Sequence, residues 1–255
     1  MRLIHQIALD YGLIGRWSGQ DSGLILKEHT QQQQRSGTLQ GTALWVEGPV
    51  PGSKAVYLDG TSGTFVNIGD LAPYKFTTQD FSVSAWVNLL DGTGDNTIMA
   101  KFGTVGQKSW TFIFVDARLF VAVSGEGSGN SNLQGATTVS LGRWYHCGFS
   151  HNYAANSDRL YLNGIDDGSG ASVVPVFDST APLVLGRRSD QNSEYINGFI
   201  GETRLYNRVL SPMEFAALAD PVTLLDRSHR SRSYAVAPPE PPEPPVVQDS
   251  LRWVY

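Results

Sequence analysis

Residues 198–219, GFIGETRLYNRVLSPMEFAALA, carry the strongest fold signal in this chain. Its first half has the alternation of a β-strand, in which neighbouring side chains point to opposite faces. The residues expected on one face of this strand are Ile200, Glu202, Arg204 and Tyr206. Because Glu202 and Arg204 are two residues apart on that face, the pattern predicts a structural ion pair between them.

The second half of the stretch predicts one short helix that begins at Pro212. Ser211 offers a hydroxyl as N-cap, and Glu214, three residues later, completes a capping box. Proline is favoured at the first helical position because its missing amide hydrogen is not needed there. Leu210 and Phe215 are spaced to form a hydrophobic staple. A strand, a tight exit and a short helix therefore close the folded unit.

Six further motifs precede this closing unit, in the order GLIGRW (12–17), AVYLDG (55–60), FSVSAWV (81–87), RWYHCGFS (143–150), RLYLNG (159–164) and LVLGRR (183–188). Together they resemble laminin-G-like domains, which are concanavalin-A-like jelly rolls found in lectins, glucanases and pentraxins. The resemblance implies an all-β fold: a two-sheet antiparallel jelly-roll sandwich with one short C-terminal helix. The chain departs from the family pattern at Gly201, where an aspartate usually precedes the glutamate.

Local patterns support strands and hairpins. FSVSAWV puts Phe81, Val83, Ala85 and Val87 on one face and Ser82, Ser84 and Trp86 on the other. Asp116-Ala117 separates two apolar runs and predicts a hairpin. Asn163-Gly164 is a strong two-residue turn signal because both residues tolerate a positive φ.

Composition limits the class of protein. The 255 residues fit one large β-domain with an extension, and 27 glycines suit many turns. The net charge of −5 disfavours a nucleic-acid partner, since phosphate binding needs a basic surface. Cys147 is the one cysteine, so no intrachain disulfide forms, and its alternation with Tyr145 and Phe149 predicts a core position.

Targeting signals are not found in the sequence. The N-terminal MRLIHQIALDYGLIG has neither a long apolar segment nor a small-residue cleavage site. No run approaches the ~18 apolar residues of a membrane span. We therefore expect synthesis in a host cytoplasm without a signal peptide, and no membrane partner.

The sequence divides into a jelly roll, residues 1–220, and a C-terminal tail, residues 221–255. The tail has a basic segment with Arg227, Arg230 and Arg232, then APPEPPEPP, then a last segment with Trp253 and Tyr255. Proline cannot donate to a sheet, so the proline run should be an extended polyproline segment. The three arginines and the two aromatic residues are candidate docking residues for a protein partner or a second copy of the chain.

Candidate catalytic groups are sparse. A retaining glucanase needs two carboxylates about 5 Å apart, and the E-x-D-x-x-E pattern of family glucanases is absent. There is no G-x-S-x-G nucleophile turn and no zinc-ligand spacing. The sequence therefore predicts a protein that is not an enzyme and needs no cofactor.

Calcium is the one metal the sequence suggests. The segment RRSDQNSEYING, residues 187–198, resembles the position of the pentraxin calcium loop. Asp190, Asn192 and Glu194 offer the oxygen ligands that a hard cation prefers. Against a site, Arg187 and Arg188 are placed to neutralise these acids.

Aromatic residues are candidates for stacking on sugar rings. Trp17, Trp86 and Trp144 lie in strand motifs and are interpreted as core residues. Trp45, Trp110 and Tyr195 lie nearer predicted loops, so they are the candidates for an exposed platform.

These observations favour a non-enzymatic structural or binding protein. The tail resembles segments that follow such domains in phage and prophage structural proteins. We therefore expect a virion surface protein of a tailed bacteriophage, either capsid decoration or tail-associated, whose jelly roll is displayed and whose tail docks on the assembly. The alternative is a carbohydrate-binding lectin module for surface attachment. A glycoside hydrolase is the third hypothesis, and it lacks its carboxylate pair.

Overall fold

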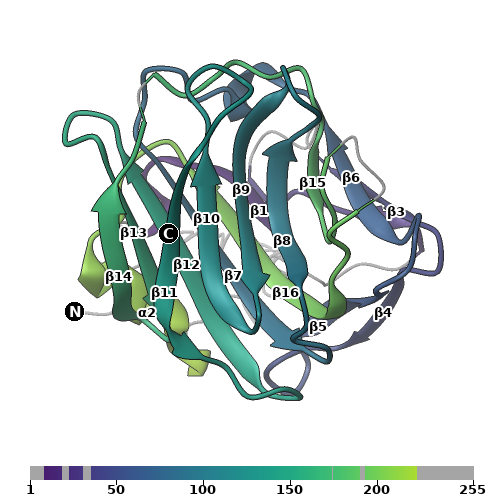
Figure 1. Cartoon of the computed structure of the whole chain (residues 1–255). Helices are drawn as coiled ribbons and strands as arrows, with labels where there is room; N and C mark the ends of the chain where they lie inside the picture. The colour runs from purple at the N-terminus through teal and green to yellow at the C-terminus, as the bar shows by residue number, and fades with distance from the viewer. Residues whose placement is uncertain (1–8, 19–22, 31–35, 174, 190–192, 223–255) are drawn as a thin grey trace, which may run out of the picture.

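In a computed structural model of the chain, residues 9–18, 23–30, 36–173, 175–189 and 193–222 are described. They form two antiparallel eight-stranded sheets that face each other (Figure 1), which confirms the predicted sandwich. The first, here called the β7 sheet, has the order β14-β13-β12-β7-β16-β5-β4, and β1 also pairs with β16. Its strands are β1 (Leu13–Trp17), β4 (Leu44–Glu47), β5 (Lys54–Asp59), β7 (Phe81–Leu89), β12 (Trp144–Asn152), β13 (Ser157–Leu162), β14 (Ile165–Ala171) and β16 (Asn197–Tyr206).

The second sheet, here called the β9 sheet, has the order β11-β10-β9-β8-β15-β6-β3-β2. Its strands are β2 (Ile25–Leu26), β3 (Gly37–Gln40), β6 (Phe65–Gly69), β8 (Asp95–Phe102), β9 (Lys108–Val115), β10 (Arg118–Val123), β11 (Ser131–Thr138) and β15 (Leu183–Leu185). A short 3₁₀ turn, η2 (Ala72–Tyr74), and the helix α2 (Pro212–Ala219) complete the described elements.

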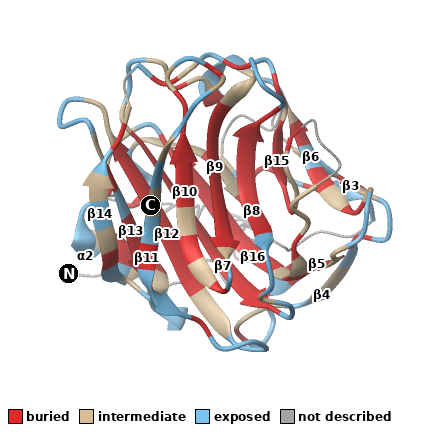
Figure 2. Ribbon diagram, viewed as in Figure 1, coloured by how far each residue is buried: buried red, intermediate tan, exposed pale blue. Residues whose placement is uncertain are grey.

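The core lies between the two sheets (Figure 2). The four apolar residues predicted for one face of β7 all join it, and the β9 sheet contributes side chains such as Phe112 and Val121. Each fully buried side chain of this kind contributes about 1.5–3 kcal/mol of transfer free energy. Cys147 is fully buried in the same core, as predicted, and burial raises the pKa of its thiol.

Two predicted hairpins are confirmed by their backbone angles. Asp116 and Ala117 join β9 to β10 with φ of 49° and 58°, and Asn163 and Gly164 join β13 to β14 with φ of 52° and 78°. Two consecutive residues of positive φ form the tight turn whose twist matches that of antiparallel strands.

Strand β16 departs from simple alternation. Ile200 pairs with Val87 and Thr203 pairs with Ala85, so β16 has one residue more than β7 over this stretch. This β-bulge reverses the alternation of side chains. The prediction that Ile200 shares a face with Glu202, Arg204 and Tyr206 is therefore wrong: Ile200 packs in the core together with Leu205.

Helix α2 covers part of the outer face of the β7 sheet. Its capping box is present, with Ser211 accepting from the amide of Glu214. Leu210 and Phe215 are both fully buried in one cluster, as the predicted staple requires. The ring of Phe215 stacks on Tyr161 and lies so close to Gly148 that an added Cβ would come within 2.6 Å of it. None of the described helices is long and apolar enough to cross a membrane.

Candidate binding face

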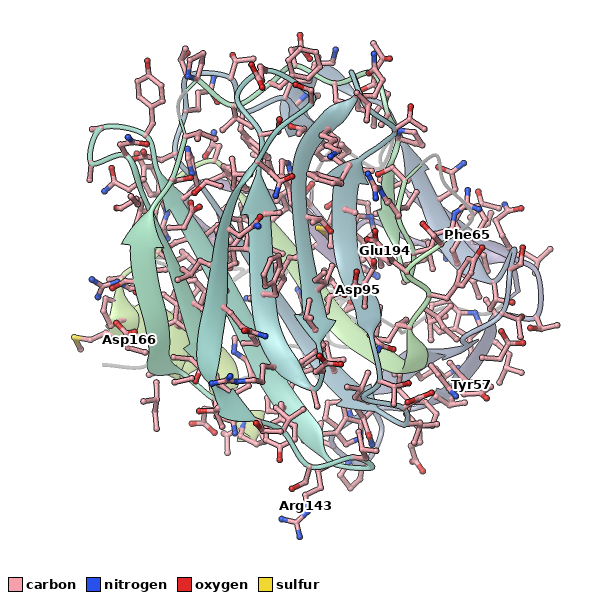
Figure 3. All side chains as sticks on the ribbon, in the orientation of Figure 1. Tyr57, Phe65, Asp95, Arg143, Asp166 and Glu194 are labelled. Atoms are coloured by element: carbon pink, nitrogen blue, oxygen red, sulfur yellow. The ribbon has the colours of Figure 1, made fainter. Side chains whose placement is uncertain are left out.

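The predicted calcium loop joins β15 to β16, and only part of it is described. Asp190 and Asn192 lie outside the described residues. Glu194 is described (Figure 3), and Nη1 of Arg188 donates to its carboxylate at 2.9 Å. Burial raises the pKa of Glu194, and the charge of Arg188 opposes that shift. Over the described residues, no group of three or more His, Cys, Asp or Glu side chains is arranged to hold a metal ion.

The docking residues predicted for the tail also lie outside the described residues. These are Arg227, Arg230, Arg232, Trp253 and Tyr255. The prediction that they bind a partner therefore stays a prediction.

Glu202 is part of a buried group of charges. The predicted ion pair with Arg204 is confirmed: Nε of Arg204 donates to Oε1 of Glu202 at 2.6 Å. Arg16, on β1, adds a second contact, its Nη2 lying 2.7 Å from Oε2. Burial alone would raise the pKa of Glu202, but the two arginines outweigh it and hold the pKa far below its usual range. A carboxylate held in this way is suited to a structural role.

A buried histidine, His151, lies between an acid and a hydroxyl. Nδ1 of His151 is 2.8 Å from the carboxylate of Asp158 and 3.3 Å from the hydroxyl of Ser172. In a catalytic triad the acid and the nucleophile contact opposite ring nitrogens. Here both contact the same nitrogen, and Nε2 has no partner within the described part of the chain. The three residues therefore form a structural network.

The outer face of the β7 sheet carries a row of aromatic side chains that crosses the strands. We call Tyr57 on β5, Phe199 on β16 and Trp144 on β12 the aromatic row. Tyr57 pairs directly with Phe199, and their ring centroids are 5.3 Å apart. The ring centroids of Trp144 and Phe199 are 6.1 Å apart. All three rings are half-buried. Figure 3 labels Tyr57 and also Arg143, the residue before Trp144, at the two ends of the row.

Asn88 on β7 lies beneath the middle of the row. It pairs with Phe199 on one side and with Trp144 on the other. Strands β16 and β12 are therefore two spacings apart, about 9–10 Å. Since the two ring centroids are only 6.1 Å apart, the rings lean together over Asn88. This explains why Asn88 is only 8% exposed.

Two asparagine oxygens next to Phe199 have no hydrogen-bond partner among the described residues. They are Oδ1 of Asn88 and Oδ1 of Asn197, which lies two residues before Phe199 on the same face. Leaving such an acceptor buried and unpaired costs about 1–3 kcal/mol. The row therefore combines apolar rings with unused acceptors, which is the composition of a ligand-binding surface.

The sequence located the aromatic platform incorrectly. Trp110, predicted to be exposed, is fully buried in the core, whereas Trp144, predicted as core, lies on the outer face. Trp86 is buried, but it packs with Val50 in a separate outer cluster. Trp17 is a core residue as predicted, and Trp45 and Tyr195 are half-buried. The alternation predicted that Ser82, Ser84 and Trp86 share one face of β7; Asn88, on the same outer face, was not singled out by the sequence. The alternation did not show which strands lie beside β7.

The fold agrees with what the chain is similar to. The chain belongs to the Laminin_G_3 family of the concanavalin A-like lectin/glucanases superfamily, whose family model matches residues 59–216. A curated relative is the rat (Rattus norvegicus) sushi, von Willebrand factor type A, EGF and pentraxin domain-containing protein 1. It is 29% identical over 127 residues, which are 47% of this chain and 4% of that protein.

Three solved structures show similar folds. The binding domain of Paraclostridial Mosquitocidal Protein 1 has a TM-score of 0.68 and 16% identity, over 84% of this chain and 53% of that one. A second is domain 4 of AbnA, a GH43 extracellular arabinanase from Geobacillus stearothermophilus, in complex with arabinotriose. Its TM-score is 0.64 and its identity 22%, over 82% of this chain and 98% of that one. A third is the ligand-binding domain of botulinum neurotoxin serotype D, in complex with N-acetylneuraminic acid. Its TM-score is 0.65 and its identity 14%, over 84% of this chain and 52% of that one. The chain thus spans about half of each toxin domain.

Proposed function

We propose that this domain is a non-enzymatic carbohydrate-binding module and that sugar rings bind on the aromatic row. The observation that carries the proposal is the row itself, Tyr57, Phe199 and Trp144, half-buried on the outer face of a rigid sheet. The faces of aromatic rings carry partial negative charge, so they attract the C–H groups of a sugar ring while also burying its apolar face. The similar structures include domains bound to arabinotriose and to N-acetylneuraminic acid, which supports a carbohydrate ligand here.

The carboxylates support a binding role in preference to hydrolysis. A glycosidase needs two carboxyl groups about 5–9.5 Å apart on either side of the bond that it cleaves. Three acids of the described residues are each held by basic partners: Asp70 by Lys101 at 2.6 Å, Asp166 by Arg159 at 3.0 Å and Glu202 by two arginines. No step of hydrolysis is therefore assigned to them.

A glycan array tests the proposal. The wild-type protein should bind a set of glycans, and Phe199→Ala and Trp144→Ala should lose that binding while keeping the wild-type melting temperature within a few degrees. The matched control is Phe120→Ala, which removes a half-buried ring from the outer face of the β9 sheet. If the wild-type protein binds no glycan, or if Phe120→Ala is the variant that loses binding, the proposal fails.

We also propose that the module is displayed on the surface of a tailed-bacteriophage virion. The support is the sequence of residues 221–255, whose basic, proline-rich and aromatic segments suit docking on a particle. An antibody against the jelly roll should label intact particles by electron microscopy. Particles that are infectious and carry no label would overturn this setting.

A further inference from the structure

We propose that the aromatic row binds an internal stretch of an extended, uncharged oligosaccharide that lies across the strands, with Asn88 and Asn197 accepting hydrogen bonds from its hydroxyl groups. This inference rests on the proposed function and adds to it the class of ligand and its direction on the sheet.

The length of the row sets the size of the ligand. Tyr57 and Trp144 are separated by three strand spacings, because β5, β16, β7 and β12 are consecutive in the sheet. At about 4.8 Å per spacing, the row is about 14 Å long. A single sugar ring would contact one or two of the three aromatic side chains. An oligosaccharide laid perpendicular to the strands contacts all of them.

Both ends of the row are open. Beyond Tyr57 the sheet continues to Leu44 on the edge strand β4, where the side chain is 48% exposed. At the other end, the last residue of β13, Leu162, pairs with Cys147, so the described part of β13 ends before it reaches Trp144. Arg143 beside it is exposed. A surface without end walls accommodates a chain that extends past it, which favours an internal segment over a chain end.

The asparagines supply the polar contacts. The rings of Trp144 and Phe199 lean over the amide of Asn88, so its Oδ1 is covered, and it has no hydrogen-bond partner among the described residues. A small rotation of either ring uncovers it. A sugar hydroxyl that then reaches Oδ1 satisfies an acceptor that is otherwise unpaired, and the same argument applies to Asn197.

The charges near the row favour an uncharged ligand. At one end, Asn197 pairs with Asp59, whose carboxylate accepts hydrogen bonds from Thr42 and Thr61. At the other end is Arg143. Asp91 also lies next to Asn197, since its amide donates to the carbonyl of Asn197 at 3.4 Å. Asp59, Asp91 and Arg143 together give no excess of positive charge with which to select an anionic sugar.

Titration calorimetry with length series tests the inference. The probes are arabino-oligosaccharides and cello-oligosaccharides from the monosaccharide to the hexasaccharide, with sialyllactose as the acidic comparison. For the series that binds, affinity should rise at least about tenfold from the monosaccharide to the trisaccharide as more rings are covered, and then level off. Sialyllactose should bind no more tightly than the neutral trisaccharide.

Two substitutions separate the asparagines from the rings. Asn88→Leu keeps the branched shape of the side chain and removes the acceptor, so it should weaken trisaccharide binding about fivefold to tenfold without lowering stability. Asn197→Leu should act in the same direction. The matched control is Asn67→Leu, on the exposed outer face of the β9 sheet, which should leave binding unchanged.

The outcomes distinguish the two proposals. If the wild-type protein binds no glycan on the array, both proposals fail; if it binds glycans on the array but none of the neutral oligosaccharides, the further inference alone fails. If glycans bind and Phe199→Ala abolishes binding, the proposed function stands. In that case equal affinity for monosaccharide and trisaccharide, tighter binding of sialyllactose, or unchanged binding by both asparagine variants would overturn the further inference alone.

Discussion

At the scale of single residues, the most consequential group is Arg16, Glu202 and Arg204. The carboxylate of Glu202 accepts hydrogen bonds from both guanidinium groups, and it is only 7% exposed. A buried charge is tolerated when it is paired, and losing its partner costs much more than the pair itself contributes.

Glu202→Gln should therefore destabilise the fold strongly. Two arginines would lose the one carboxylate that contacts both, and we expect the free energy of unfolding in urea to fall by about 3–5 kcal/mol. The control is Asp166→Asn, which breaks an exposed pair with Arg159 and should cost less than about 1 kcal/mol. Equal, small losses for both variants would show that water stabilises the two guanidiniums.

His146 gives the fold a dependence on pH. It lies on the outer face of β12, edge-on to Trp86, and is 2% exposed. Burial, aided by the charge of Arg204, lowers the pKa of His146 to about 3. The unfolded chain binds a proton at this residue near pH 6.5, and the folded chain does not.

Stability should therefore fall as the pH is lowered from about 6.5 towards 3, by up to about 1.4 kcal/mol per pH unit from this residue. Urea unfolding at several values between pH 6.5 and 4.5 measures the slope. His146→Gln removes the titrating group and should flatten it. An equally steep slope in the variant would place the pH dependence elsewhere.

Gly201 has a packing reason for lacking a side chain. A Cβ at this position would lie 3.1 Å from Cβ of Trp86 and 3.5 Å from Pro49. The aspartate that the family usually has here would therefore compete with Trp86 and Pro49 for the same space.

At the scale of elements, helix α2 depends on its first turn. The side chain of Glu214 accepts from the amide of Ser211 at 2.8 Å, while the hydroxyl of Ser211 accepts in return at 3.3 Å. Arg208 also contacts Glu214, at 2.6 Å, and so fixes the same carboxylate.

Ser211→Ala should lower the free energy of unfolding by about 1 kcal/mol, because the amide of Glu214 loses its acceptor. Ser211→Asp keeps an acceptor at the N-cap and should be close to wild type. Thermal melts of the two variants measure the difference. If both variants lose the same free energy of unfolding, the loss of the N-cap acceptor is not the cause of the destabilisation.

The loop between β15 and β16 gives a second prediction at this scale. Because Glu194 is already paired with Arg188, we expect chelator and added calcium to leave the melting temperature unchanged. A bound cation would raise it by mass action. If calcium raises the melting temperature by several degrees and chelator reverses the rise, the loop does bind calcium.

At the scale of the whole molecule, the two large hydrophobic clusters among the described residues contain residues between Leu9 and Leu218. The sequence predicts that the tail, residues 221–255, is needed for assembly and not for folding.

A chain ending at Asp220 should therefore fold and bind glycans but fail to join its particle or partner. Circular dichroism, the glycan array and co-sedimentation with particles measure the three properties. An unfolded truncated chain would show that the tail belongs to the domain. Normal assembly without the tail would show that docking lies elsewhere.

The strands of the quoted motifs, the two tight turns, the helix with its cap and the burial of Cys147 could be predicted from the sequence. These depend on neighbours within a few residues, and alternation or turn chemistry reports them directly. The ion pair of Glu202 and Arg204 belongs to the same group, because both residues lie on one strand.

The tertiary structure alone decided the bulge in β16, the entry of Arg16 into the charge group, and the aromatic row. Tyr57, Asn88, Trp144 and Phe199 come from four strands whose order in the sheet is not their order in the chain. Alternation says which face a side chain takes, but only strand pairing says what lies beside it. Trp110 and Trp144 also exchanged their expected places, although the alternation of Tyr145, Cys147 and Phe149 already puts Trp144 on the opposite face of its strand.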